Sequence, residues 1–305
     1  MTGTATSARP TASFFQRVNL PIGLQLYTLG DAPRQDLDAT LARVAAIGYR
    51  DIELPNLLGK SAAEVKAAAD RAGLKISALH VPGAPIGGPA AGTLQEPPEK
   101  TAEMLAALGA ANAVVPIMLL PTGLRPAAGE SFQSAIARVV AAAGTDIWKR
   151  TAALLNERAA ALKPMGIHLG YHNHNMEFAA IGADGGKTSG WRILTQETER
   201  DLVSFEIDVG WVAAAGLDPV AFLNKHKGRI RQLHIKDILA PGTPNYALMM
   251  DPTQIGDGVL DWARILPAAH KAGVRNFYVE QEPPFTIDRI DAIKRSFDYL
   301  AALRA

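Results

Sequence analysis

The chain alternates apolar, β-branched segments with alanine-rich segments of helical period, and it does so eight times along its 305 residues. This alternation is typical of repeated strand and helix units around a parallel sheet. A glycine stands shortly before several strand segments, where a helix would end: Gly48, Gly73, Gly109, Gly166 and Gly273. The recurrence predicts an α/β fold, a single (β/α)8 TIM barrel over residues 21–305.

The predicted elements follow from the same pattern. We expect strands at 22–27, 51–54, 75–81, 113–117, 167–172, 203–208, 230–236 and 276–281. We expect helices at 34–47, 62–72, 98–108, 131–162, 219–225 and 260–272. An open doubly wound sheet that bound a nucleotide would carry a glycine-rich turn after its first strand, and none follows Tyr27.

Composition limits the function. The 31 basic and 30 acidic residues nearly cancel, which favours a small-molecule substrate over nucleic acid. Without cysteine, any metal must be held by oxygen and imidazole. Residues 1–20 have no apolar run long enough for a signal peptide or a membrane helix. We interpret them as a flexible tail on a cytoplasmic protein that does not bind membranes.

Residues that bind metals or transfer protons stand at the ends of four late strand segments. Asp208, His234 and Glu280 each follow a mostly apolar run, and the fifth strand ends in His172-Asn-His174. Taken singly, an Asp at a strand end is often a helix N-cap and a His is often a hydrogen-bonding residue. A buried Glu, however, needs a metal, a cation or a raised pKa. Because consecutive barrel strands bring their ends together, the joint pattern favours one divalent metal site.

Several further residues are candidates for substrate contact. Lys236 shares a strand face with His234 and should touch substrate rather than metal, because ammonium is a poor ligand. Glu53 and His80 end earlier strands, where a capped helix and a core histidine are equally good interpretations. Glu177 lines the site or only begins a loop, and Trp211 stacks on a sugar or packs in the core. Loops 83–95 and 240–254 are candidate lids.

Together these segments resemble a known family. The ordered set Gly-Leu-Gln25-Leu-Tyr-Thr, Asp-Ile-Glu53, Tyr-His172-Asn-His174-Asn-Met-Glu177-Phe, Asp208-Val-Gly-Trp211, His234-Ile-Lys236-Asp237, Ile-Gly256-Asp-Gly258 and Val-Glu280-Gln-Glu282 is similar to the xylose isomerase-like TIM barrels, the sugar phosphate isomerases and epimerases. The similarity runs from about residue 22 to the C-terminus.

The resemblance implies a metal-dependent sugar isomerase or epimerase. In that family one Mn, Mg, Zn or Co ion is held by Glu, Asp, His and Glu on strands five to eight, and the last three match Asp208, His234 and Glu280. The ion polarises a carbonyl and stabilises the enediolate left by proton abstraction. Gln25, Glu53, His80, Glu177 and Trp211 would then contact the sugar. Members are often dimers or tetramers, so a homo-oligomer is compatible.

Strand five departs from the family pattern. The family reads Glu-Asn-His where this chain reads His172-Asn-His174, so the first ligand would be the His172 imidazole and a paired glutamate base is missing. His174, Glu280 and Lys236 become the candidate acid and base groups. A keto-sugar dehydratase or 3-keto-glycoside lyase, which needs one base, also suits this change.

Two other functions stay open. The same barrel serves abasic-site endonucleases, which hold three zinc ions with additional histidines, but strand four here ends at Met118 with no ligand. A non-catalytic sugar-binding barrel is the other alternative. The particular sugar, its phosphorylation and the metal are left open by the sequence.

Overall fold

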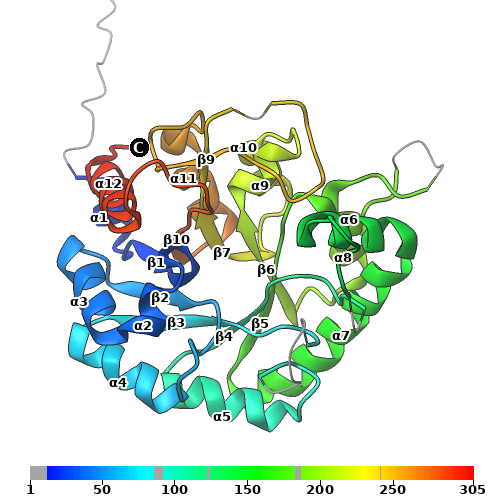
Figure 1. Ribbon diagram of the computed structural model, residues 1–305, viewed down its shortest axis with the longest axis horizontal. Helices are drawn as coiled ribbons and strands as arrows, with labels where there is room; N and C mark the ends of the chain where they lie inside the picture. The colour runs from blue at the N-terminus through cyan, green and yellow to red at the C-terminus, as the bar shows by residue number, and fades with distance from the viewer. Residues whose placement is uncertain (1–11, 86–91, 122–123, 183–186, 241) are drawn as a thin grey trace, which may run out of the picture.

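The computed structural model describes residues 12–85, 92–121, 124–182, 187–240 and 242–305. Its centre is a closed parallel barrel with strand order β1-β10-β7-β6-β5-β4-β3-β2 (Figure 1). The barrel strands are β1 Gly23–Gln25, β2 Asp51–Leu54, β3 Lys75–His80, β4 Asn112–Val115, β5 His168–His172, β6 Val203–Asp208, β7 Ile230–Ile235 and β10 Asn276–Val279. The predicted TIM barrel is confirmed.

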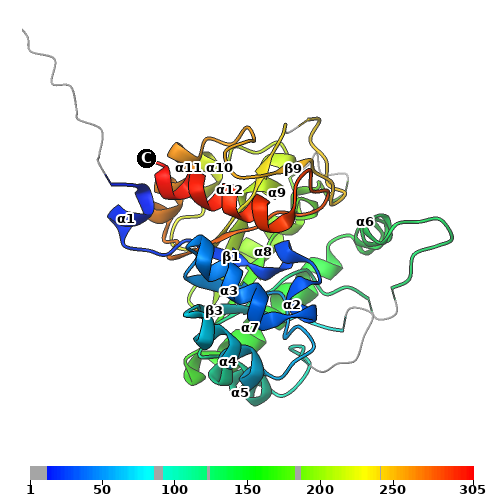
Figure 2. The same cartoon turned by 60° about the vertical axis from the view of Figure 1, so that its left-hand side comes forward.

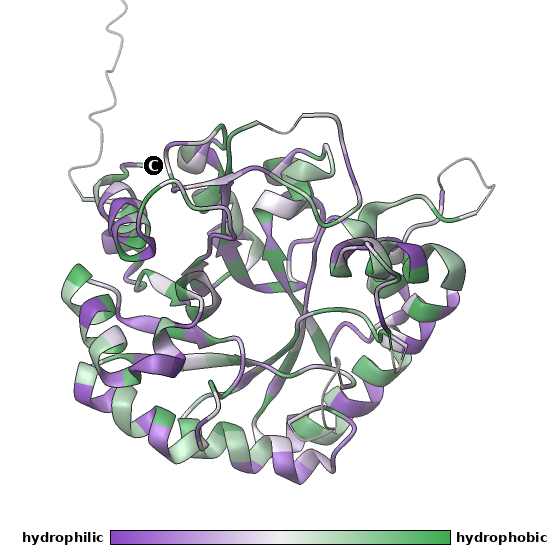
Figure 3. Ribbon diagram, viewed as in Figure 1, coloured by the Kyte–Doolittle hydropathy of each residue, from purple (hydrophilic) through white to green (hydrophobic). Residues whose placement is uncertain are grey.

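Helices surround the barrel (Figure 1). They are α1 Phe14–Val18, α2 Ala32–Gln35, α3 Leu37–Ile47, α4 Ala62–Ala72, α5 Pro98–Leu108, α6 Phe132–Ala143, α7 Asp146–Leu162, α8 Gly190–Glu197, α9 Val209–Ala214, α10 Pro219–Lys225, α11 Trp262–Ala272 and α12 Arg289–Ala302, with short 3-10 turns at Leu26–Leu29, Lys163–Met165 and Met176–Phe178. The helices mix hydrophilic and hydrophobic residues, whereas long stretches of the strands are hydrophobic (Figure 3). Burial of the apolar helix faces against the strands therefore forms the core.

Local sequence explains where the helices begin and end. Helix α4 starts with a capping box, in which Ser61 and Glu64 each accept a hydrogen bond from the other's backbone. It ends at Gly73, whose φ of 68° lies in the left-handed region that glycine tolerates best. This confirms the expected glycine at the helix C-terminus and turns the chain back into β3.

The register of the strands sets which residues face one another across the site. His172 pairs with Glu206, and Asp208 pairs with His234. His234 in turn pairs with Tyr278 on β10, two residues before Glu280. Parallel pairing therefore brings the predicted ligands on β5, β6, β7 and β10 to the same end of the barrel.

Two predicted helices are interrupted. The expected helix at 34–47 breaks at Asp36, whose extended backbone (φ −148°) lets its side chain cap α3 by accepting from Ala39 N at 2.9 Å. The expected helix at 131–162 breaks at Gly144, where φ is 55°, and becomes α6 and α7. Both breaks were missed because the two segments are rich in alanine. Helix propensity alone does not show where a side chain caps a new helix instead of continuing the first one.

The ends of several strands also differ from the predicted ends by one or two residues. The first strand stops at Gln25, because the Gln25 side chain accepts from Tyr27 N and starts a 3-10 turn. The seventh strand stops at Ile235, one residue before the expected end, and a separate strand, β8 Asp237–Ile238, follows Lys236 and pairs antiparallel with β9 Pro252–Thr253. This small ladder holds the base of the expected lid at 240–254, of which residue 241 is outside the described part.

The docked part of the chain begins before residue 21. Phe14 and Phe15 on α1 are buried against Phe277, and Phe14 N donates to Leu303 O at 2.8 Å. Helices α1 and α12 consequently lie side by side (Figures 1 and 2). Residues 1–11 of the expected tail, and 86–91 of the expected lid at 83–95, lie outside the described residues. Within the described ranges, no helix combines the length and the apolar character needed to span a bilayer.

Candidate metal centre and active site

Four strands deliver the predicted metal ligands to one point. His172, Asp208, His234 and Glu280 each offer a ligand atom, and these atoms all lie within 4.8 Å of one another. All four side chains are buried. They lie at the carboxyl ends of the strands, the face where barrel enzymes carry their active sites. The structure thus brings together the group that the strand ends predicted.

A cavity of about 260 Å³ opens above this cluster. His80, His172, His174 and Glu280 form part of its wall, together with Tyr27, Pro55, Pro116, Ile117, Phe132, Gln133, Ile136, Trp211, Leu248 and Glu282. Three of these residues come from α6, a helix that projects away from the barrel body (Figure 2). The mixture of imidazoles, carboxylates and apolar side chains suits a small polar ligand with a carbon skeleton.

Asp208 is both a helix N-cap and a candidate metal ligand, the two roles that its sequence position allowed. Its Oδ1 caps α9 by accepting from Trp211 N at 3.1 Å. Its Oδ2 has no hydrogen-bond partner in the described part of the chain, although the Lys236 ammonium makes an ion pair with it at 2.9 Å. One carboxylate oxygen is therefore used by the fold, and the other is directed at the ligand cluster.

Lys236 is a buried cation among three carboxylates. Its Nζ lies 2.9 Å from Asp208, 2.8 Å from Glu280 and 2.9 Å from Glu282. Burial alone would lower the pKa of Lys236, but these carboxylates outweigh it and raise that pKa well above its usual value. The ammonium stays charged and links two candidate metal ligands to Glu282 on the cavity wall.

A second layer of polar side chains lies deeper in the barrel. Glu53 and Glu206 are fully buried and are surrounded by the imidazoles of His80, His172 and His234. His234 Nε2 lies 2.6 Å from Glu53 Oε2, and His172 Nδ1 lies 3.1 Å from Glu206 Oε2. The other ring nitrogen of His234, Nδ1, faces Glu280 at 2.9 Å.

Two glutamines complete this layer. Gln25 Nε2 donates to Glu53 at 2.9 Å, and Gln232 Nε2 donates to Glu206 at 3.1 Å and to Glu53 at 3.5 Å. Gln25 and Glu53, which the resemblance assigned to the sugar, lie beneath the cavity rather than along its wall. His80, assigned to the same role, does line the cavity and also contacts both glutamates.

The protonation of the histidines differs from one ring to the next. Burial lowers the pKa of His172 to about 4, and the neighbouring His234 adds to the shift. Burial also lowers the pKa of His174 well below its usual value. For His80, burial opposes protonation but Glu53 and Glu206 outweigh it and raise the pKa to about 9. Near neutral pH, His172 and His174 are therefore neutral and have a lone pair available.

The two outer carboxylates differ as well. Burial raises the pKa of Asp208 to about 6. Burial would also raise the pKa of Glu280, but Lys236 and His234 outweigh it and hold that pKa well below its usual range. Both groups are ionised near neutral pH, as metal ligands must be.

Trp211 and His174 form one side of the cavity. Their rings lie 5.5 Å apart, and Lys236 Nζ lies 5.1 Å from the Trp211 ring. Trp211 Nε1 and His174 Nδ1 are buried and have no hydrogen-bond partner among the described residues. Buried polar atoms without a partner are uncommon in folded proteins, so both atoms are candidates for bonds to a bound ligand.

Glu177 is placed behind the site. Its buried carboxylate accepts from Tyr171 Oη at 2.7 Å and from His174 N at 3.0 Å. Burial raises the pKa of Glu177 to about 7. It lies outside the set of cavity-lining residues, and its contacts secure the backbone that carries His174.

Sequence reasoning missed Glu206, Gln232 and Glu282 as site residues. Glu206 and Gln232 stand two positions before Asp208 and His234, so the two-residue period of a strand places them on the same face, one layer deeper. Extending the strand alternation inward from each predicted ligand would have found both. Glu282, two residues after Glu280, would have followed from the same rule.

A further buried aspartate anchors the loop beside the site. Asp237 accepts hydrogen bonds from the backbone of Ile238, Gly256 and Leu260 and from Trp262 Nε1. A Cβ on Gly258 would overlap the Asp237 carboxylate. The Ile-Gly256-Asp-Gly258 segment is thus a tight structural turn around this carboxylate.

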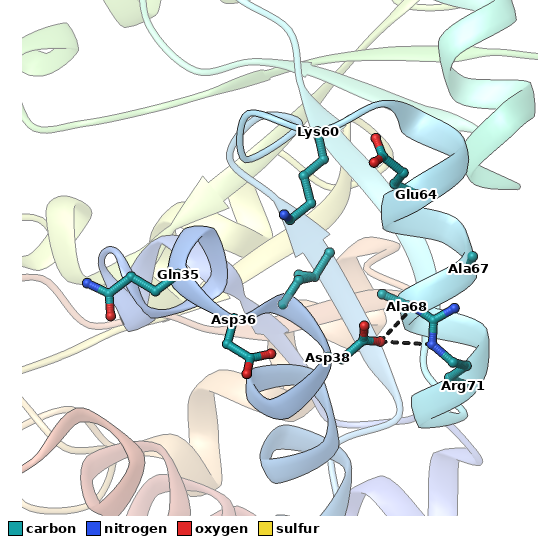
Figure 4. Close-up of a pocket in the computed structure, with 9 residues that line it drawn as sticks. Gln35, Asp36, Asp38, Lys60, Glu64, Ala67, Ala68 and Arg71 are labelled. Carbon is teal, nitrogen blue, oxygen red and sulfur yellow. Dashed lines mark hydrogen bonds and ion pairs between the residues drawn. The ribbon is translucent and has the colours of Figure 1, made fainter.

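Another surface depression, of about 360 Å³, lies between α3 and α4 (Figure 4). Its charged residues include Lys60, Glu64 and an ion pair between Asp38 and Arg71. Both partners of that pair are mostly exposed to solvent, where an ion pair contributes little free energy. The barrel mouth is the better site, because several buried groups converge there.

Comparison with known proteins agrees with this geometry. A family model described as the xylose isomerase-like TIM barrel matches residues 41–303, most of the chain. The chain belongs to this family. Among solved structures, the chain is similar to a sugar phosphate isomerase/epimerase from Parabacteroides distasonis ATCC 8503, with 25% identity and a TM-score of 0.71 over 99% of this chain and 98% of that one.

Two other proteins are similar to this chain. An inosose dehydratase from Geobacillus thermodenitrificans (strain NG80-2) is 29% identical over 153 residues, which is 46% of either chain. The chain spans about half the length of the curated inosose dehydratases that it matches. A zinc-bound IOLI protein has the same fold, with a TM-score of 0.62 and 16% identity over 92% of this chain and 98% of that one.

Proposed function

We propose that this chain is a divalent-metal-dependent enzyme that removes a proton from the carbon next to the carbonyl of a sugar or keto-polyol, as an isomerase or epimerase. The observation that carries the proposal is the convergence of His172, Asp208, His234 and Glu280 on one point below a cavity. Two imidazoles and two carboxylates form a donor set that suits Zn, Mn or Co, and Mg less well.

The residues present fit such an ion. Asp208 Oδ2 belongs to the ligand group and is ion-paired with Lys236 at 2.9 Å, and His172 is neutral near pH 7, so each has a lone pair that can bind an ion. When bound, a divalent ion supplies a Lewis acid that polarises a carbonyl oxygen. The ligands would be His172, Asp208, His234 and Glu280.

The protein's own groups can carry the proton transfer. His174 is neutral and its Nδ1 has no partner among the described residues, so it can accept a proton from a substrate in the cavity. Glu280 is the alternative base if it leaves the ligand set. Lys236 is a charged donor beside the cavity wall and can hold a substrate oxygen.

A dehydratase or 3-keto-glycoside lyase is the second candidate. Inosose dehydratases are among the relatives, although each is matched over about half its length. His172 in place of a glutamate also removes one of the paired bases that an epimerase uses on opposite faces. In an elimination, one base takes the proton and Lys236 protonates the departing oxygen.

Metal content is the first test of the proposal. Asp208→Ala should lose the divalent ion, because Oδ2 is a proposed ligand. Asp218→Ala is the matched control: Asp218 also caps a helix, α10, by accepting from Val220 N at 2.8 Å, but it lies outside the ligand group. Elemental analysis of purified proteins should find the ion in wild type and Asp218→Ala only. Equal metal in all three would refute the assignment.

Deuterium incorporation separates the two reactions. Ketoses, inososes and 3-keto glycosides would be incubated with the metal-loaded enzyme in deuterated water. Solvent deuterium in recovered or isomerised sugar would support the isomerase, and release of water or aglycone would support elimination. A protein that binds metal but turns over none of these compounds would instead favour a binding role.

A further inference from the structure

The deeper polar layer of the barrel suggests how the metal ligands are held. Glu53 and Glu206 belong to β2 and β6, and each lies against an imidazole of the proposed ligand group. Both carboxylates are fully buried, and neither lines the cavity. A substrate in the cavity does not explain their presence, and two buried carboxylates need compensating partners.

Each of the two imidazoles directs one ring nitrogen to the ligand group and the other to a deeper carboxylate. His234 presents Nε2 to Glu53 at 2.6 Å and Nδ1 to Glu280 at 2.9 Å, with Asp208 Oδ2 at 3.9 Å. His172 presents Nδ1 to Glu206 at 3.1 Å, which leaves Nε2 for the ligand group. Histidines that bind metals commonly donate their other N–H to a carboxylate, which sets the tautomer and makes the ligand more basic.

Resting on the proposed metal centre, we propose that Glu53 and Glu206 are positioning residues that hold His234 and His172 with Nδ1 and Nε2, respectively, turned toward the divalent ion. Both positioning carboxylates are themselves fixed. Gln25 donates to Glu53, and Gln232 donates to Glu206. The side chains of the second layer therefore have little freedom to turn away from the imidazoles.

Glu206 also adds negative charge close to the ligand group. His172 brings a neutral imidazole to that group, whose negative charge comes from Asp208 and Glu280. The Glu206 carboxylate lies behind the His172 ring and places a further negative charge one layer deeper. Through the shared N–H, it makes the His172 imidazole a stronger donor to the ion.

A competing arrangement uses many of the same atoms. His80, His172, Glu206 and His234 also offer ligand atoms within 4.8 Å of one another. An ion held there would make Glu206 a ligand and would use the nitrogens of His172 and His234 that face inward. The two arrangements differ in whether Asp208 and Glu280, or His80 and Glu206, are essential.

Zinc affinity tests the proposal. Binding would be measured by competition with a chromophoric chelator for wild type, Glu53→Gln, Glu206→Gln and Glu206→Ala. We expect zinc affinity to fall about 10- to 100-fold for Glu206→Ala, and less for the Gln variants, whose amide oxygen still accepts the N–H. Ser77→Ala is the control, because its hydroxyl is buried in the same barrel, lies 2.6 Å from Tyr278 Oη and has no hydrogen bond to an imidazole among the described residues.

The outcomes separate the two proposals. Zinc affinity within twofold of wild type in every Glu53 and Glu206 variant would overturn the positioning role and leave the metal centre intact. Loss of zinc in His80→Ala with retention in Asp208→Ala would also overturn it, because the ion would then sit in the deeper group. Absence of zinc binding by wild type would refute the metal centre itself, and the positioning role with it.

A measurement on the wild-type protein avoids variants that fail to fold. In long-range ¹⁵N–¹H spectra of zinc-loaded protein with labelled histidine, the ring proton should be on Nδ1 of His172 and on Nε2 of His234. The opposite tautomer at either residue would overturn the proposal. Removal of zinc should change the spectra of these two rings, whereas the exterior His168 should be unaffected.

Discussion

At the scale of single residues, the site is defined by side chains that serve the fold and the chemistry together. Asp208 caps α9 with one oxygen and faces the ligand group with the other. Lys236 neutralises three carboxylates while standing beside the cavity wall. Substitutions here will therefore change stability as well as function, and an informative experiment must measure both.

Lys236→Met should keep the metal and lose turnover, because we propose that the ammonium donates to substrate and does not bind the metal. Without metal, the variant should also be less stable by about 3–5 kcal/mol, since Asp208 and Glu280 would be buried without their cation. Metal content, turnover and melting temperature with and without zinc would be measured, with exposed Lys294→Met as control. Metal loss with turnover retained would contradict this role.

Asp51 should give the stability of the protein a pH dependence. Burial raises its pKa from 3.8 to about 6, so the folded state holds this proton more tightly than the unfolded state does. The resulting stability is complete at low pH and is lost as the pH rises through about 6. Relative to Asp51→Asn, wild type should lose about 1 kcal/mol of unfolding free energy between roughly pH 5 and 7.5.

Urea unfolding of both proteins at the two pH values would measure this difference. Asp251→Asn, at an exposed position, controls for the loss of one charge. An unchanged difference between wild type and Asp51→Asn at the two pH values would count against a raised pKa at Asp51.

At the scale of elements, Lys236 is positioned by the close approach of α9 to the chain just after β7. A Cβ on Gly210 would lie 2.9 Å from both Cγ and the carbonyl oxygen of Lys236. Helix propensity favours alanine over glycine by about 1 kcal/mol, but overpacking costs about 1–3 kcal/mol. The cost of the overlap should exceed the gain in helix propensity, because one of the two overlapping atoms, the carbonyl oxygen of Lys236, belongs to the backbone.

We therefore expect Gly210→Ala to lower the melting temperature and to reduce turnover by displacing Lys236. Gly170→Ala in β5 is the control, because its nearest atom would be at 3.4 Å, an ordinary contact. Calorimetry of both variants would test this. Equal melting temperatures for wild type and Gly210→Ala would show that α9 can move away from β7 without cost.

At the scale of the whole molecule, the proposed ion joins four strands of the closed barrel, so it should stabilise the fold. An ion at a free concentration 100 times its dissociation constant contributes about 2.7 kcal/mol. Chelation should then lower the melting temperature by roughly 5 °C. Thermal unfolding with and without EDTA would measure this. Asp208→Ala should show no such shift, and a chelator effect of equal size in that variant would contradict the assignment.

Much of the architecture could be predicted from local patterns. The strands Asp51–Leu54 and Val203–Asp208 and the helices Ala62–Ala72, Pro98–Leu108 and Pro219–Lys225 have the predicted bounds. Apolar periodicity and terminal glycines mark such elements strongly, because they reflect burial and backbone geometry within one segment. The breaks at Asp36 and Gly144 were missed, because each depends on a choice between continuing a helix and capping a new one.

The sequence by itself determined the repeated strand and helix units and the ligand-type residues at the strand ends, since both can be recognised within short segments of the chain. Only the tertiary structure decided which groups face one another. The contact of Glu206 with His172, and of Glu53 with His234 at 2.6 Å, depends on barrel closure and strand register across many residues. Such contacts leave no local pattern, because the partners are adjacent only after the sheet has closed.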